Sequence, residues 1–126
     1  MADATTTLDD LRTAVIAFRD ERDWARFHTP KNLAMAVTTE AAELAELYLW
    51  QEDPDRPTGE RVERTAQEMA DVLIYLLCLA DTLKIDLTSA VKAKLAKNAE
   101  KLPADAVRGT VERYNESKRR PRRSGF

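Results

Sequence analysis

Two pairs of acidic residues with the same spacing are the side chains in this 126-residue chain best suited to chemistry. Glu40 and Glu43 form one pair and Glu68 and Asp71 the other, each within an apolar run typical of a helix. Residues three apart are neighbours on a helix, so each pair directs two carboxylates the same way. If the two helices pack together, four carboxylates converge, which is costly without a cation. Oxygen ligands favour Mg²⁺, Mn²⁺ or Ca²⁺ over zinc, so the pattern predicts a divalent-metal site for phosphate chemistry.

The residues around these acids favour ligands over solvated surface groups. Surface helices usually alternate acids with Lys or Arg to form pairs along the helix. No Lys or Arg occurs between Lys31 and Arg56. Glu46 continues the three-residue step, but this step drifts around a helix of 3.6 residues per turn and places Glu46 at the margin. On spacing alone, acids that face solvent without a metal remain the alternative.

The first acidic pair lies in the second of two expected helices. The first helix begins after Thr7, whose hydroxyl can cap the turn together with Asp10, and fades near Trp24. Thr29 followed by proline is a strong start signal for the second helix, because proline is tolerated at the first helical position. The apolar spacing predicts that this helix continues to about Gln51.

The second acidic pair lies in a third expected helix, at about residues 60–83. Residues 52–59 contain two prolines and a glycine and are expected to be a connector. A fourth helix is predicted at about residues 87–101, ended by proline, and a short fifth around residues 107–117. The sequence therefore predicts an all-α fold.

Composition and charge indicate one soluble domain with a basic end. The chain is 44% hydrophobic and has only three glycines, and no uninterrupted apolar run reaches the length of a membrane span. The net charge of −2 combines about +4 in residues 104–126 with about −6 in residues 1–103. A solvated, disordered tail explains the basic end better than a nucleic-acid site. Cys78 has no partner cysteine, and the N-terminus lacks a secretory signal, so we expect a cytoplasmic protein.

Several catalytic arrangements are missing from the sequence. It contains no Ser-His-Asp set, no glycine-rich phosphate loop and no Cys/His metal cluster. The single histidine, His28, is not placed to form the Glu-x-x-His pairs of di-iron bundles. Attack by water is therefore favoured over covalent catalysis and redox chemistry.

The acidic motif resembles the metal motif of the MazG-like all-α nucleotide pyrophosphohydrolases, and four longer blocks look like the dCTP pyrophosphatase branch of that family. These blocks are FRDERDW at 18–24, FHTPKNL at 27–33, EAAELAEL at 40–47 followed by Trp50, and DVLIYL at 71–76. The similarity covers roughly residues 8–103. It implies a helical domain at residues 1–103, followed by the basic tail at 104–126.

The resemblance implies a four-helix bundle protomer that forms a dimer or a tetramer, with sites between helices and across a subunit boundary. It also implies Mg²⁺-dependent hydrolysis of dCTP, or a related dNTP, to the monophosphate and pyrophosphate, which cleanses the nucleotide pool. Mn²⁺ would be a substitute metal.

Carried over by position, the resemblance assigns roles to individual residues. The metal-binding and catalytic residues would be Glu40, Glu43, Glu68 and Asp71. Lys94 and Asn98, four apart on the fourth helix, would meet the phosphates. Without the resemblance, these two residues would be read as surface groups, and the tryptophans as cover for the core. The residues that would line or shape the nucleoside pocket are Trp24, His28, Asn32, Trp50 and Tyr75.

The sequence also departs from the family pattern. Gln67 stands where many relatives have a second glutamate, Val15 where animal dCTP pyrophosphatases have a histidine, and Leu102 where a tyrosine is common. These changes leave dUTP or a non-standard purine triphosphate open as the substrate. A non-catalytic helical scaffold is the alternative of another class.

Overall fold

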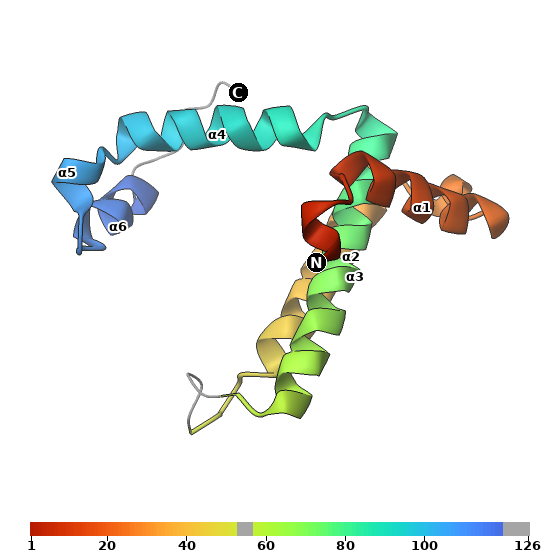
Figure 1. Cartoon of the computed structure of the whole chain (residues 1–126), viewed down its shortest axis with the longest axis horizontal. Coiled ribbons are helices and arrows are strands. Elements are labelled where there is room, and N and C mark those ends of the chain that lie inside the picture. The colour runs from red at the N-terminus through yellow and green to blue at the C-terminus, as the bar shows by residue number, and fades with distance from the viewer. Residues whose placement is uncertain (53–56, 120–126) are drawn as a thin grey trace. The chain divides into compact units, whose positions relative to one another are not determined.

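The computed structural model describes residues 1–52 and 57–119, and every regular element in these ranges is helical (Figure 1). The chain forms two compact units, Met1–Asp86 and Leu87–Phe126. The prediction of an all-α protein is confirmed. The elements are η1 (Ala2–Ala4), α1 (Leu8–Glu21), η2 (Ala25–Phe27), α2 (Pro30–Glu46), α3 (Gly59–Leu83), α4 (Leu87–Lys101), α5 (Ala104–Val107) and α6 (Glu112–Arg119).

Both hydrogen bonds of the predicted N-terminal cap of α1 are present. The Thr7 hydroxyl accepts a hydrogen bond from the Asp10 amide at 3.1 Å, and the Asp10 carboxylate accepts one from the Thr7 amide at 2.9 Å. These bonds satisfy two amides that the helix itself cannot pair. They also lower the pKa of Asp10. The helix ends at Glu21, before the predicted Trp24, and Asp23 then adopts a left-handed conformation with φ of 53°.

Helix α2 starts where the sequence predicts but ends earlier. The Thr29 hydroxyl accepts from the Asn32 amide at 3.2 Å, and Pro30 is the first helical residue. The prediction of a helix that continues to Gln51 is wrong, because α2 ends at Glu46. Beyond it, the Tyr48 amide bonds a carbonyl only three residues back, at 3.1 Å, and Trp50 has φ of 58°. The chain leaves the helix through these tight turns.

Helices α3 and α4 match the predicted ranges closely. Thr58 caps α3 by accepting from the Arg61 amide at 3.3 Å, and left-handed Lys84 ends the helix. The single short helix expected around residues 107–117 is instead two helices, α5 and α6. The break contains Gly109 with φ of 75°, a conformation that glycine adopts at little steric cost. Of the predicted disordered end, residues 120–126 lie outside the described residues.

The core of the first unit lies where α2 and α3 pack along each other and α1 packs on α3 (Figure 1). Arg19 on α1 forms an ion pair with Asp81 on α3 at 3.0 Å, and the Arg12 guanidinium donates to the Ile85 carbonyl at 3.2 Å. These contacts hold α1 against α3. The antiparallel α2–α3 pair is the frame that positions both acidic pairs. Within the described residues, no helix is both long and apolar enough to cross a membrane. The buried apolar residues of the core are Leu33, Leu47, Leu77, Cys78 and Ala80.

Candidate active site

The packing of α2 against α3 brings the predicted carboxylates together. One carboxylate oxygen from each of Glu40, Glu68 and Asp71 lies within 4.8 Å of the other two. Glu43 is not one of these three, but its charge contributes to the raised pKa values of Glu40 and Glu68, so its carboxyl lies beside the group. Glu40, Glu68 and Asp71 are half-buried, whereas Glu43 is exposed. Three of the four carboxylates that were predicted to converge therefore do so in this structure, and Glu43 lies beside them.

The carboxylates of this cluster destabilise one another's charge. Burial, then the hydrogen bond and the charge of Glu43, raise the pKa of Glu40. Burial, then the charges of Glu43 and Asp71, raise the pKa of Glu68, and the nearby Arg64 opposes this increase. Like charges disfavour ionisation of their neighbours, so a bound cation would relieve the repulsion.

The donor set fits a hard divalent cation. The Oε2 atoms of Glu40 and Glu68 are buried, and neither has a hydrogen-bond partner among the described residues. Buried carboxylate oxygens are normally paired or bound to a metal. A set made only of carboxylates suits Mg²⁺, Mn²⁺ or Ca²⁺ rather than zinc. Glu40, Glu68 and Asp71 are thus the residues whose geometry could hold a metal ion, with Glu43 beside them.

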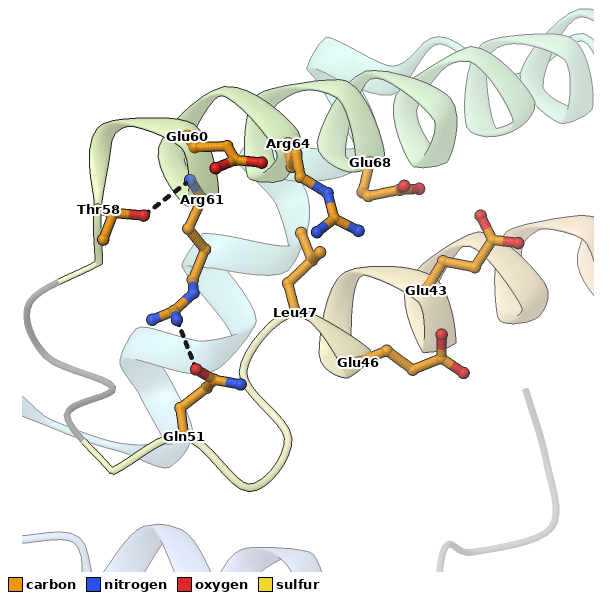
Figure 2. Close-up of a pocket in the computed structure, with 9 residues that line it drawn as sticks. All are labelled: Glu43, Glu46, Leu47, Gln51, Thr58, Glu60, Arg61, Arg64 and Glu68. Carbon is orange, nitrogen blue, oxygen red and sulfur yellow. Dashed lines mark hydrogen bonds between the residues drawn. The ribbon is translucent and has the colours of Figure 1, made fainter.

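A pocket of about 560 Å³ extends from the carboxylates to the connector between α2 and α3 (Figure 2). Its walls carry both signs of charge, because two arginines of α3 lie among the acids. The pocket is lined by Glu43, Glu46, Leu47, Gln51, Thr58, Glu60, Arg61, Arg64 and Glu68.

The two arginines have different surroundings in this pocket. The Arg61 guanidinium donates a hydrogen bond to the Gln51 side chain, whereas Arg64 makes no hydrogen bond or ion pair with any described residue (Figure 2). Neither arginine was predicted from the sequence as a site residue. The signal that could have found them is their spacing, because Arg61 and Arg64 continue the face of α3 that carries Glu68.

Tyr75 and His28 lie in the first unit and are both half-buried. Burial, followed by the charges of Glu40 and Asp71, raises the pKa of Tyr75, which places its hydroxyl near the carboxylates. The Nδ1 atom of His28 is buried with no partner among the described residues, and burial and the charge of Arg19 lower its pKa. His28 is therefore mainly neutral at pH 7.

Asn32 has a local structural contact. Its side-chain amide donates to the Phe27 carbonyl at 3.0 Å, while its backbone amide is bound to the Thr29 cap. These bonds fix the entry of the chain into α2. The predicted contact of Asn32 with the nucleoside stays a prediction.

The two tryptophans lie at opposite ends of α2. Trp24 precedes η2 and packs edge-on against Phe18, with ring centroids 6.0 Å apart, and is 45% exposed. Trp50 follows α2 and is 90% exposed. The 17 residues of α2 span roughly 25 Å. A single chain therefore does not bring both indoles to one base.

Lys94 and Asn98 lie on α4, in the unit Leu87–Phe126. They are exposed, and their spacing of four residues keeps them on one face of that helix. Their contact with the substrate phosphates stays a prediction.

Comparison with known proteins assigns the chain to a family. The model of the MazG-like family matches residues 35–116, which is more than half of the chain. The chain belongs to the MazG-like family. The matched range contains both acidic pairs and the two pocket arginines, whereas Trp24, His28 and Asn32 precede it.

Individual relatives of this MazG-like chain agree with the assignment. The dCTP pyrophosphatase 1 of Homo sapiens is 42% identical over 114 residues, which cover 87% of this chain and 67% of that protein. The Rattus norvegicus protein of the same name is 40% identical, with the same shares covered. The crystal structure of a pyrophosphatase from Archaeoglobus fulgidus has a TM-score of 0.65 and 42% sequence identity, covering 75% of this chain and 91% of that chain.

Proposed function

We propose that this protein hydrolyses dCTP, or a closely related deoxynucleoside triphosphate, to the monophosphate and pyrophosphate with the help of Mg²⁺. As a MazG-like protein related to dCTP pyrophosphatase 1 at 40–42% identity, the chain is a nucleotide pyrophosphohydrolase. The base, the sugar and the metal are the proposed parts. The observation that carries the proposal is the convergence of Glu40, Glu68 and Asp71, whose ligand atoms lie within 4.8 Å of one another.

The metal would be held by the four carboxylates of Glu40, Glu43, Glu68 and Asp71. When bound, Mg²⁺ or its substitute Mn²⁺ neutralises negative charge on the phosphates and favours ionisation of water. The buried, unpartnered oxygens of Glu40 and Glu68 support this assignment.

Other residues of the first unit suit the binding of an uncharged nucleoside. His28 has a lowered pKa, so its neutral ring can exchange hydrogen bonds with a base without adding charge. Tyr75 presents a hydroxyl that stays protonated, because burial and the charges of Glu40 and Asp71 raise its pKa. The exposed indoles of Trp24 and Trp50 offer flat surfaces on which a base can stack.

A site completed by a second copy of the chain belongs to the same proposal. If Trp24 and Trp50 serve one base, they must come from different chains, because α2 separates them within one chain. Met35 on α2 and Met69 on α3 are 61% and 58% exposed, which leaves apolar surface beside the acidic helices. We expect a dimer or a tetramer, measurable by light scattering coupled to size-exclusion chromatography.

Pyrophosphate release from a panel of nucleotides tests the proposed activity. The panel contains dCTP, dUTP and non-standard purine triphosphates, each with Mg²⁺ and with a chelator in its place. We expect the highest kcat/KM for dCTP and loss of release with the chelator. No release from any nucleotide would overturn the proposal, and a higher kcat/KM for dUTP or a purine would change only the substrate.

A further inference from the structure

One face of α3 carries an ordered row of charged and polar side chains. The row consists of residues 61, 64, 68, 71 and 75, whose steps of three and four keep them on one side of a helix. Guanidinium groups come first, at the connector end of the pocket, and the two carboxylates follow. Tyr75 comes after the carboxylates, about one turn further along the helix. A ligand that spans this row therefore meets cations at one end only.

Arg64 is the cation of this row next to the carboxylates. Its side chain reaches from α3 into the pocket beside Leu47 (Figure 2). The charge of Arg64 partly offsets the increase in the pKa of Glu68, yet no ion pair joins the two residues within the described part of the chain. The four-residue step between Arg64 and Glu68 corresponds to a rise of about 6 Å along the helix axis. The Arg64 donors thus face the pocket and remain available to a ligand.

We propose that Arg64 binds the pyrophosphate part of the triphosphate substrate. A guanidinium presents a planar fork of N–H donors that matches phosphate oxygens and retains its charge at any physiological pH. Because Arg64 has no hydrogen bond or ion pair in the described structure, it breaks none when a phosphate binds. Arg61, one turn away, is already bound to Gln51 and forms the outer wall of the pocket. This assignment rests on the proposed function.

The order of the side chains along the row indicates that Arg64 binds the pyrophosphate part of the substrate rather than the nucleoside part. The carboxylates of Glu68 and Asp71 separate Arg64 from Tyr75, the residue of the row that suits a nucleoside. When water attacks the α phosphorus, its oxygen bonds to that phosphorus and its proton passes to solvent. The bond from the α phosphorus to the bridging oxygen breaks, and that oxygen leaves with the pyrophosphate and the electron pair. A cation fixed at this end stabilises the charge that develops on the leaving group.

Binding of inorganic pyrophosphate to the full chain tests the role of Arg64. Isothermal titration calorimetry in Mg²⁺ would compare wild type with Arg64→Gln and Arg64→Lys. Loss of charge-assisted hydrogen bonds is expected to weaken pyrophosphate binding about 10- to 100-fold in Arg64→Gln. The pyrophosphate affinity of Arg64→Lys should lie between those of wild type and Arg64→Gln, because lysine keeps the charge but lacks the planar fork of donors. Binding of dCMP should stay within about twofold of wild type in both variants.

Lys31→Gln is the matched control, since it removes one positive charge from an exposed position at the far end of α2. It should bind pyrophosphate as wild type does. Unchanged pyrophosphate affinity in Arg64→Gln would overturn the assignment. Equal losses of affinity for dCMP and for pyrophosphate would also overturn it. So would tighter Mg²⁺ binding with unchanged pyrophosphate affinity, because that result would mean that Arg64 only balances the charge of Glu68.

Failure of the proposed function would look different. In that case wild-type protein would release pyrophosphate from no nucleotide. If it still bound inorganic pyrophosphate in an Arg64-dependent manner, the anion site would stand and only the reaction would be rejected.

Discussion

The hydroxyl oxygens of Tyr48 and Thr65 lie 2.7 Å apart and join the turn after α2 to the first part of α3. The Thr65 hydroxyl also bonds the Arg61 carbonyl at 2.7 Å. A threonine hydroxyl has one proton, which goes to that carbonyl, so the Tyr48 hydroxyl must donate to Thr65. This bond sets the register of the two helices next to the pocket arginines.

Tyr48→Phe removes this link and little else. Because both hydroxyls are partly buried, we expect the free energy of unfolding to fall by about 0.5–1.5 kcal/mol, measured by urea denaturation. Thr65→Ser is the matched control, since it retains the hydroxyl and should lose less stability. A Tyr48→Phe protein as stable as wild type would show that the bond contributes nothing.

Glu43→Gln separates an enzyme from a helical scaffold. Neutralising one carboxylate of the cluster should lower kcat/KM at least about 100-fold, since even the outer partners of metal ligands are worth about 10- to 100-fold. The metal-free variant should be at least as stable as wild type, because one like charge is gone. Pyrophosphate release and thermal unfolding in a chelator are the two measurements.

Glu63→Gln is the control for this variant, being an exposed acid of α3 outside the pocket lining. It should retain wild-type activity. If Glu43→Gln kept full activity, Glu43 would not be a metal ligand.

The raised pKa of Glu40 makes the stability of the metal-free protein depend on pH. A carboxyl with a raised folded-state pKa contributes stability that is fully present below its ordinary pKa of 4.5 and is lost as pH rises through the folded-state value. The advantage of Glu40→Gln over wild type should therefore grow from pH 4 to pH 8 in a chelator. Saturating Mg²⁺ should reverse that advantage.

Asp10 should give the opposite dependence of stability on pH. Its pKa is lowered by its bonds to Thr7, so its contribution is present above its ordinary pKa of 3.8 and is lost as pH falls. The difference in unfolding free energy between wild type and Asp10→Asn should shrink in acid. If both substitutions showed the same pH trend, their environments would have been assigned incorrectly.

Leu77 should be among the residues on which the first unit depends most. It is 1% exposed, and its truncation to alanine leaves a cavity that costs about 2–5 kcal/mol of unfolding free energy. The neighbouring Leu76 is 37% exposed, so Leu76→Ala should cost less than half as much. Urea denaturation of the two variants measures the difference, and equal losses would contradict the burial of Leu77.

The helix starts and the acidic cluster could be predicted because local chemistry decides them. Thr7, Thr29 and Thr58 cap three helices through hydrogen bonds to amides three residues on, and such bonds depend only on nearby sequence. The convergence of Glu40 with Asp71 required one further assumption, that the two helices pack with their acidic faces together.

The ends of helices and the cationic part of the pocket were harder to predict. No glycine or proline directly follows Glu46, so only the tertiary contacts of Leu47 and Tyr48 mark where α2 stops. From sequence alone, Arg61 and Arg64 would be interpreted as ordinary surface residues, because charged residues near the start of a helix usually face solvent. Their spacing places them on the face of α3 that carries Glu68, but only the pairing of α3 with α2 shows that they line one pocket with Glu43.

The backbone at Trp50 has a consequence for engineering heat-resistant forms of this protein. A non-glycine residue with φ of 58° carries strain of about 1–2 kcal/mol, which glycine would relieve. Part of this gain in unfolding free energy would be lost, because glycine also raises the conformational entropy of the unfolded chain. A library selected only for survival at high temperature is expected to accept Trp50→Gly, whereas one selected for turnover should retain the indole if it stacks on the base as proposed. Selection for heat resistance and selection for turnover should therefore favour different residues at position 50.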